Sequence, residues 1–502
     1  MSATEVVTVS VPSAAIILQD IPKTDLIHAI SVTDLPDGAQ LERKRDAPAS
    51  VLDIDSESDT DSKLGMELGS SKKFSFKEIP RNRGRLFATC WIIVSIGLND
   101  GSVGALLPQI EAYYNINYAI VSTIWLANSI GFITIAVVTH WLYSRLGRVG
   151  MFVLGTAFLT MAFAILAPGP PFGAVLVAFF LSGLGAALVN SQANVFVSYL
   201  QHTEAMFGVM HGSYGVGATF GPLIATAMVD KGMLWSHYYF ILLGMNFMGV
   251  IFAFYFFQGC DKDLGTDYLL HKSKKEKAAL AEKQAMNLEA GIPYTSEEEG
   301  PSIFKQAIRS KTTWLAAFVL LFYQGAEVSI GGWIVSFIIE TRHGNSSTSG
   351  YIASGFWAGV TLGRFVLNPI IPHLTTPYRA IWVLIAFAIA FEFCTWFLPT
   401  VLSSAVTVAI VGLFVGPMCP SALSAVSDIL PRRIQTVSLS ITSAFGSTGG
   451  ALWPFVTGIL AQTVGTYVVH PVAIALFFSM AFMWCFVPYN VTKRLAAQRK
   501  VA

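Results

Sequence analysis

The feature that most constrains the fold of this sequence is a series of apolar segments, each about 20 residues long. A helix of about 20 residues crosses the hydrocarbon core of a bilayer. We predict twelve such spans, at 87–110, 118–139, 149–167, 172–200, 206–229, 237–257, 313–340, 350–371, 379–398, 402–427, 434–462 and 467–488. The sequence therefore predicts an all-α membrane protein with twelve transmembrane helices in two pseudo-symmetric bundles of six.

Composition supports this assignment and excludes other classes of protein. Hydrophobic residues make up 53% of the 502 residues and charged residues only 13%, which leaves too little polar surface for a soluble protein of this size. The net charge is +1 and no basic block is interleaved with aromatic residues, so we expect a lipid bilayer and no nucleic acid as partner. The sequence contains no HExxH motif, no Walker motif and no cysteine spacing typical of metal ligands. We therefore expect that the protein is not an enzyme and binds no metal or cofactor.

The polar parts of the chain divide it into five regions. Residues 1–80 are rich in Ser, Thr, Asp and Pro, and their acidic run at 53–62 has no apolar periodicity, which is typical of a disordered tail. The predicted order is a cytoplasmic tail (1–80), a six-helix bundle (81–257), a charged cytoplasmic linker (258–311), a second six-helix bundle (312–488) and a short tail (489–502).

Positive charges predict the orientation of the chain. A basic collar of Arg81, Arg83 and Arg85 stands directly before the first span, which favours a cytoplasmic amino end. With that end inside, the inner connections hold Arg145, Arg148, Arg379, Arg432 and Arg433, whereas the outer ones hold only Lys231 and Arg342. Both termini are therefore predicted to be cytoplasmic, and the sequon at Asn345 falls in an outer loop where it can be glycosylated.

Asp100 is the residue of the first span that most demands an explanation. A carboxylate near the bilayer centre costs roughly 2.5–3.5 kcal/mol even on the mildest scale, so it usually faces a protein interior or a water-filled path. We expect Asp100 to couple transport to protons and the neighbouring Asn99 to contact a solute. The alternative is that Asp100 caps a local kink, with Asn99 and Gly101 loosening the helix, because Gly101 and Gly104 follow within a turn.

The second half repeats this arrangement. Glu327 lies about as far into the seventh span as Asp100 does into the first, and glycines follow each of them. We predict that Glu327 couples to protons, or that it forms a fixed ion pair with Arg364 of the eighth span. Arg364 has two further alternatives, which are to bind a carboxylate or hydroxyl of a solute and to extend toward the cytoplasmic surface.

Other polar and aromatic residues are weaker candidates for solute binding. Asn190 and Asn194 share one helical face, where amides bind hydroxyls or join helices. The further candidates are Gln324, Trp333 and Trp357 as cavity liners, and His211 and Tyr214 as part of an inner vestibule. Glu392 lies closer to the outer interface, so we expect a structural role for it at the lipid edge.

Several motifs resemble the major facilitator superfamily across nearly everything after residue 80. The loop HWLYSRLGR resembles the signature between the second and third spans of that family, because Arg145, Gly147 and Arg148 match it. Ser144 stands where the family has an acid, which puts the usual charge lock of this gating loop in doubt. The stretches HGSYGVGATFGPLIAT, GAEVSIGGWI and SGFWAGVTLGR resemble fungal relatives of the fucose-proton symporter branch.

This resemblance implies a secondary transporter that moves a sugar-like or other small solute with protons by alternating access. An exporter of amphipathic secondary metabolites by proton exchange is the alternative within the same fold. A receptor that binds a solute without moving it is a third reading, which we rank below both. We expect the plasma membrane rather than the vacuolar membrane as its location.

Overall fold

The computed structural model describes residues 8–11, 14–17, 73–265 and 303–488. The chain divides into two units, residues 1–71 and 72–502. In the first unit, β1 (Thr8–Val11) pairs with β2 (Ala14–Ile17) in an antiparallel hairpin. These two short strands are the exception to the expected all-α fold among the described residues, because runs rich in Val, Ile and Thr favour strands. The disordered tail expected for residues 1–80 stays a prediction. The rest of 1–72 and all of 489–502 lie outside the described residues.

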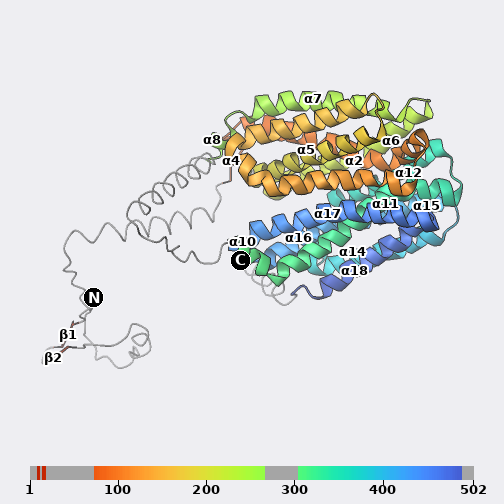
Figure 1. Cartoon of the computed structure of the whole chain (residues 1–502). Helices are drawn as coiled ribbons and strands as arrows, with labels where there is room; N and C mark the ends of the chain where they lie inside the picture. Colours follow the sequence, from red (N-terminus) through yellow and green to blue (C-terminus); the bar gives the residue numbers. More distant parts are fainter. Residues whose placement is uncertain (1–7, 12–13, 18–72, 266–302, 489–502) are drawn as a thin grey trace, which may run out of the picture. The chain divides into compact units, whose positions relative to one another are not determined.

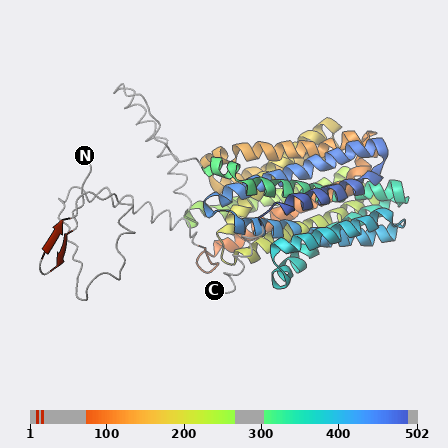
Figure 2. The ribbon, with the colours of Figure 1, turned by 90° about the horizontal axis from the view of Figure 1, so that it is seen from below.

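The second unit is a bundle of long helices that run side by side (Figures 1 and 2). Its first half contains α2 (Arg81–Tyr114), α3 (Tyr118–Val121), α4 (Thr123–Leu166), α5 (Phe172–Ser198), α6 (Thr203–Asp230), η1 (Trp235–His237), α7 (Tyr238–Phe257) and α8 (Cys260–Asp263). Its second half contains α10 (Ile303–Arg309), α11 (Lys311–Arg342), α12 (Ser346–Leu362), η2 (Gly363–Leu367), α13 (Asn368–Leu374), α14 (Pro377–Phe397), α15 (Val401–Val415), α16 (Met418–Ile429), α17 (Arg432–Val464), η3 (Thr466–Val468) and α18 (Val469–Cys485). All of the predicted apolar segments are helical.

Nine helical stretches among the described residues are long and apolar enough to cross a bilayer. The fifth, eighth and eleventh predicted spans are also helical but are not among these nine, and they correspond to α6, α12 and α17. These helices pack against the opposite half, because α6 contacts α12 and α17 contacts α4. Gly, Ser and Thr suit such contacts, since small side chains let helix backbones approach closely.

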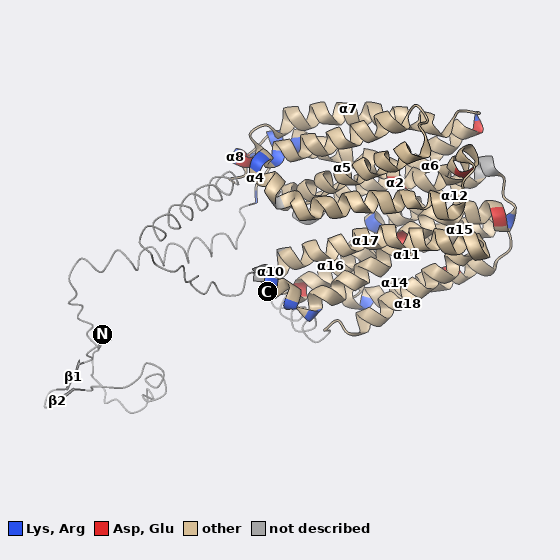
Figure 3. Ribbon diagram, in the orientation of Figure 1, with Lys and Arg blue, Asp and Glu red and all other residues tan. Residues whose placement is uncertain are grey.

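Each half has its own apolar core. One cluster of buried side chains is built almost entirely from residues 88–264, and a second from residues 307–487. Charged residues gather toward the two ends of the bundle, with a few between them (Figure 3). We call the end where α7 stops and α11 begins the linker end. The opposite end, which carries the turns at 115–117, 343–345 and 465, is the loop end.

Candidate functional site

An ion pair inside the second half brings together two predicted site residues. Arg364 Nη2 lies 2.7 Å from Glu327 Oε1, and Glu327 is only 3% exposed. The same nitrogen donates to the Tyr323 hydroxyl at 3.4 Å, and Arg364 Nε donates to the Gly416 carbonyl at 3.4 Å. Since the guanidinium is engaged between α11 and the α15–α16 junction, the alternative in which Arg364 extends toward the cytoplasmic surface is wrong.

A local change of helix type positions Arg364. The chain from Gly363 to Leu367 is a π-helix set between α12 and α13. Such wider turns interrupt α-helices most often at functional sites. Here the wider turn carries the arginine that pairs with Glu327.

Asp100 lies in the middle of α2 and is exposed, although Asn99 and Gly101 on either side of it are buried. Its Oδ1 accepts a hydrogen bond from Asn99 Nδ2 at 3.1 Å, and its Oδ2 accepts one from the Tyr214 hydroxyl at 3.1 Å. Since α2 runs from Arg81 to Tyr114, Asp100 lies inside a continuous helix, and its capping of a local kink stays an untested alternative. It is an exposed carboxylate far from either end of its helix.

Tyr214 connects the two acidic sites. While its hydroxyl donates to Asp100, its ring lies beneath the guanidinium of Arg364, with 5.9 Å between Cζ and the ring centroid. This distance is within the range of a cation–π contact. A series of contacts therefore runs from Asp100 through Tyr214 and Arg364 to Glu327, and it crosses from the first half to the second.

Three polar candidates of the first half are partly or fully exposed, whereas Asn99 is buried. His211 is exposed one turn before Tyr214, and its ring stacks on Phe207 with 6.0 Å between centroids. On α5, Asn190 is partly exposed and Asn194 is exposed. Solute binding by these residues stays a prediction.

The candidates of the second half are more enclosed. Trp333 is fully buried, and its Nε1 donates to the Pro454 carbonyl at 3.0 Å. Trp357 is 3% exposed and packs on Gly331. Gln324 is partly exposed, with its Oε1 beside Gly446 of α17. The structure does not bring the two tryptophans to the exposed surface around Asp100, so their role as cavity liners stays a prediction.

The loop that matches the family signature has no acid of its own. An aspartate from a distant part of the chain, Asp261, binds there instead. Arg148 is 1% exposed, and it donates to both carboxylate oxygens of Asp261 on α8, from its backbone N–H at 2.8 Å and from Nε at 3.2 Å. Tyr143 donates to the same carboxylate at 2.9 Å. Sequence reasoning missed Asp261, because the segment after the sixth span carries no motif that links it to Ser144.

The environment of Asp261 favours its charged form. Burial raises the pKa of this carboxyl, but the hydrogen bonds from the backbone and side chain of Arg148 and from Tyr143 outweigh it, so the pKa lies below its ordinary value. The third signature residue, Arg145, stacks over the Trp141 ring at 4.4 Å. Gly147 has φ 62° and ψ −175°, a conformation that interrupts α4 between the second and third spans.

Glu392 does not lie at the lipid edge as predicted. It is fully buried, and its Oε1 lies 2.7 Å from Nδ1 of His470, which is fully buried as well. The ring of Phe337 packs edge-on against the imidazole at 4.2 Å. The pair joins α14 to α18, and sequence spacing alone could not reveal it.

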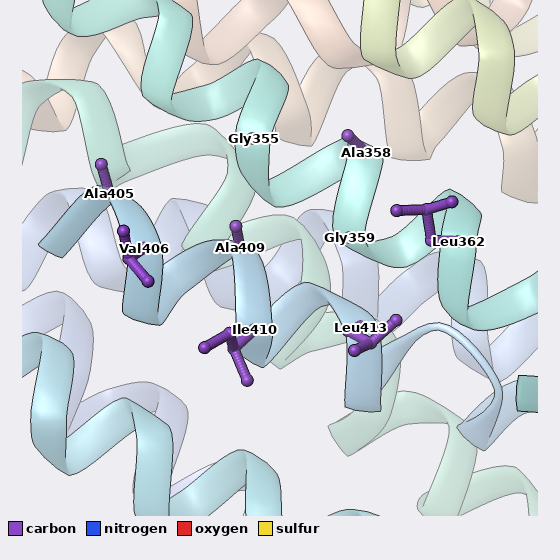
Figure 4. Close-up of a pocket in the computed structure, with 9 residues that line it drawn as sticks. All are labelled: Gly355, Ala358, Gly359, Leu362, Ala405, Val406, Ala409, Ile410 and Leu413. Atoms are coloured by element: carbon purple, nitrogen blue, oxygen red, sulfur yellow. The ribbon is translucent and has the colours of Figure 1, made fainter. Parts of the chain in front are cut away.

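Two further predicted positions lie apart from these sites. Asn345 is exposed in the turn between α11 and α12, where a glycan has access, and glycosylation there stays a prediction. Figure 4 shows a groove of about 470 Å³ between α12 and α15. Its lining consists of Gly355, Ala358, Gly359, Leu362, Ala405, Val406, Ala409, Ile410 and Leu413. With no polar side chain in this lining, the groove does not suit a hydroxylated solute.

Comparisons with known proteins agree with this architecture. Residues 89–454 match the profile of the Major Facilitator Superfamily. The chain is 29% identical to bypass of stop codon protein 6 of Saccharomyces cerevisiae over 407 residues, which cover 78% of this chain and 80% of that protein. It is 27% identical to the glucose/galactose transporter of Brucella abortus over 178 residues, covering 34% and 40%.

The fold is also similar to a solved structure, that of the fucose:proton symporter FucP of Escherichia coli. A crystal structure described as its outward conformation matches with a TM-score of 0.54 at 15% identity, covering 82% of this chain and 99% of FucP. The expected resemblance to this superfamily is thus confirmed. The chain belongs to the Major Facilitator Superfamily, and it is a multi-pass integral membrane protein that works as a secondary transporter rather than as an enzyme.

Proposed function

We propose that this transporter moves a small, hydroxylated, sugar-like solute together with protons by alternating access. The observation that carries the proposal is the series of contacts Asp100–Tyr214–Arg364–Glu327, which links one carboxylate in each half. A coupling site needs a group that gains and loses a proton and a connection from that group to the moving parts. Asp100 is the exposed group, and Tyr214 is the connection.

The proposed coupling follows from what a proton does to Asp100. As a carboxylate, Asp100 accepts a charge-assisted hydrogen bond from Tyr214. Protonation removes that charge and weakens the bond, so the Tyr214 ring is free to leave the guanidinium of Arg364. The interactions of the Arg364 guanidinium with the Tyr214 ring and with Glu327 then change in relative strength. The contact between the halves changes with them.

The loop end supports alternating access, because the two halves are in close contact there. A methyl group built on Gly104 would lie 2.2 Å from the carbonyl oxygen of Gly331, and one built on Gly458 would lie 2.5 Å from Ser122 Cβ. We assign this end to the outside, in keeping with the charge pattern, and place both termini in the cytoplasm. The structure then corresponds to an externally closed state, whereas the FucP crystal structure is described as outward.

The assignment to a sugar-like solute rests on polar groups and on relatives. Exposed or partly exposed polar side chains occur on helices of both halves, namely the carboxylate of Asp100 and the amides of Asn190, Asn194 and Gln324. Such groups bind hydroxyls well, and two proteins similar to this chain carry the names of sugar transporters. We propose the plasma membrane as its location, where an external solute and a proton gradient are both available.

A transport experiment tests this function. The full chain is purified into sealed vesicles, and uptake of sugars and polyols is measured with and without an imposed pH gradient, acidic outside. We expect accumulation of at least one such solute that depends on the gradient. Binding without accumulation at any gradient would indicate a receptor and contradict the proposal, and efflux of amphipathic metabolites alone would identify an exporter.

A further inference from the structure

A small polar hollow of about 200 Å³ opens between the halves at the loop end, away from Asp100. Its lining consists of Glu111, Ile116, Asn117, Tyr118 and Gln462. Tyr118 makes two hydrogen bonds to the second half there. Its backbone N–H donates to Gln462 Oε1 of α17 at 3.0 Å, and its hydroxyl donates to Glu340 Oε2 of α11 at 3.1 Å. One residue of the first half thus holds two helices of the second.

Tyr118 also packs against the apolar part of this closure. Its ring meets Trp333 edge-on at 5.5 Å, and Trp333 lies 5.5 Å from Trp125 of the first half. Aromatic pairs at these distances contribute beyond the area that they bury. Opening of the loop end must separate these rings and break both hydrogen bonds of Tyr118.

Two carboxylates from opposite halves lie at the base of this closure. Glu111 of α2 lines the hollow beside Tyr118, and Glu340 of α11 accepts the hydroxyl of the same tyrosine, so Tyr118 lies next to one carboxylate from each half. Glu340 is exposed and accepts the Tyr118 hydroxyl, whereas Glu111 Oε1 is buried and has no hydrogen-bond partner among the described residues. Two negative charges across a closed interface oppose closure, and a proton bound to Glu111 removes the repulsion while Glu340 keeps the charge that accepts the Tyr118 hydroxyl.

The elements next to this closure carry other titratable groups. They are Tyr113, Tyr114, Tyr118, Arg342, His343 and Tyr467. Arg342 directs its guanidinium elsewhere, since Nη2 donates to the Trp396 carbonyl at 2.6 Å and the group lies over the Phe337 ring at 4.9 Å. His343 is exposed in the turn that follows α11.

We propose that Tyr118 is the latch of the external gate and that Glu111 and Glu340 make this latch sensitive to external protons. At low external pH Glu111 holds a proton and the latch closes. At high external pH both carboxylates are ionised, and their repulsion favours an open loop end. This proposal rests on the alternating access proposed above, and it adds a regulatory site distinct from Asp100.

Distance measurements on the full chain test the proposal. Spin labels are introduced as noncanonical amino acids at Asn115 and Thr463, which are exposed on opposite sides of the closure, so that the five natural cysteines are retained. Pulsed electron resonance then gives the populations of short and long distances from pH 5 to pH 8. We expect the long-distance population of the unmodified protein to grow as pH rises.

Three variants give this measurement its specificity. Glu111→Gln with Glu340→Gln should abolish most of the pH dependence, and Tyr118→Phe should lower the closed-to-open ratio by roughly 2- to 10-fold, the worth of one hydrogen bond. Asp230→Asn, which removes an exposed acid at the same end, should behave as the unmodified chain.

The outcomes separate this proposal from the proposed function. Two distance populations whose pH dependence survives in the double glutamine variant would overturn the gate and leave alternating access intact. A single short distance at every pH and in every variant would contradict alternating access and the gate together.

Discussion

The guanidinium of Arg364 lies over the ring of Tyr214, and the hydroxyl of that ring donates to Asp100 at 3.1 Å. Tyr214 belongs to the first half and Arg364 to the second. The Tyr214 side chain therefore hydrogen-bonds the carboxylate of Asp100 in its own half and contacts a cation of the other half. Because Arg364 also pairs with Glu327 at 2.7 Å, a change at Asp100 can reach the opposite half without a large movement.

Tyr214→Phe separates the two contacts of this residue. The ring and its cation–π contact remain, whereas the hydrogen bond to Asp100 is lost. We expect solute binding to persist and gradient-driven uptake to fall by roughly 2- to 10-fold, the range of one hydrogen bond. Tyr214→Leu removes both contacts and should reduce uptake further, so equal uptake by the two variants would contradict a role for the hydroxyl.

Glu327→Gln leaves the cation of Arg364 inside the protein without its counterion. Breaking a buried ion pair by removing one partner destabilises the fold by about 3–5 kcal/mol. Because Arg364 is partly exposed, we expect the loss for this variant to be at or below the lower end of that range. We expect a lower unfolding temperature in detergent. The double variant Glu327→Gln, Arg364→Met should recover much of this loss and remain inactive. Recovery of transport by the double variant would show that the pair only stabilises the fold.

Asp261→Asn tests the clamp that replaces the missing acid of the signature loop. The pKa of Asp261 is lowered in the folded chain, so its charge stabilises the fold at pH values above the ordinary pKa of an aspartate, and this contribution is lost as pH falls through the lowered value. We expect the asparagine variant to be about 1–2 kcal/mol less stable near pH 7, with a difference that shrinks on acidification. A constant difference from pH 7 to pH 3 would exclude the ionic contribution.

Gly147→Ala tests the bend between the second and third spans. The values φ 62° and ψ −175° lie in a region that only glycine adopts without strain, at a cost of about 1–3 kcal/mol for other residues. The matched control is Gly173→Ala in α5, where an added methyl group meets no atom within 4 Å. We expect the first variant to unfold at lower temperature and the second to match the parent, and equal stability of both would contradict the strain argument.

The apolar segments predicted the fold well, because length and hydropathy report directly on the bilayer. Asp100, Glu327 and Arg364 were found in the same way, since a charge inside an apolar span is conspicuous. Tyr323 also left a signal, because it lies four residues before Glu327 on the same helical face.

The pairs between distant elements left no such signal. Asp261 meets Arg148, and His470 meets Glu392, only because helices far apart in sequence are neighbours in space. Tyr118 has no motif around it in the sequence. Its two hydrogen bonds to the other half depend on the way the two halves pack against each other. The pairing of Thr8–Val11 with Ala14–Ile17 was hidden by the polar composition of the surrounding tail.

The most direct test of the central claim compares two modes of transport by Asp100→Asn in sealed vesicles. Exchange of labelled for unlabelled solute at equal pH needs alternating access but no net proton movement, whereas accumulation needs coupling. We predict that the variant keeps exchange and loses accumulation driven by an inward proton gradient. Accumulation by Asp100→Asn with the extent and pH dependence of the unmodified protein would contradict the account.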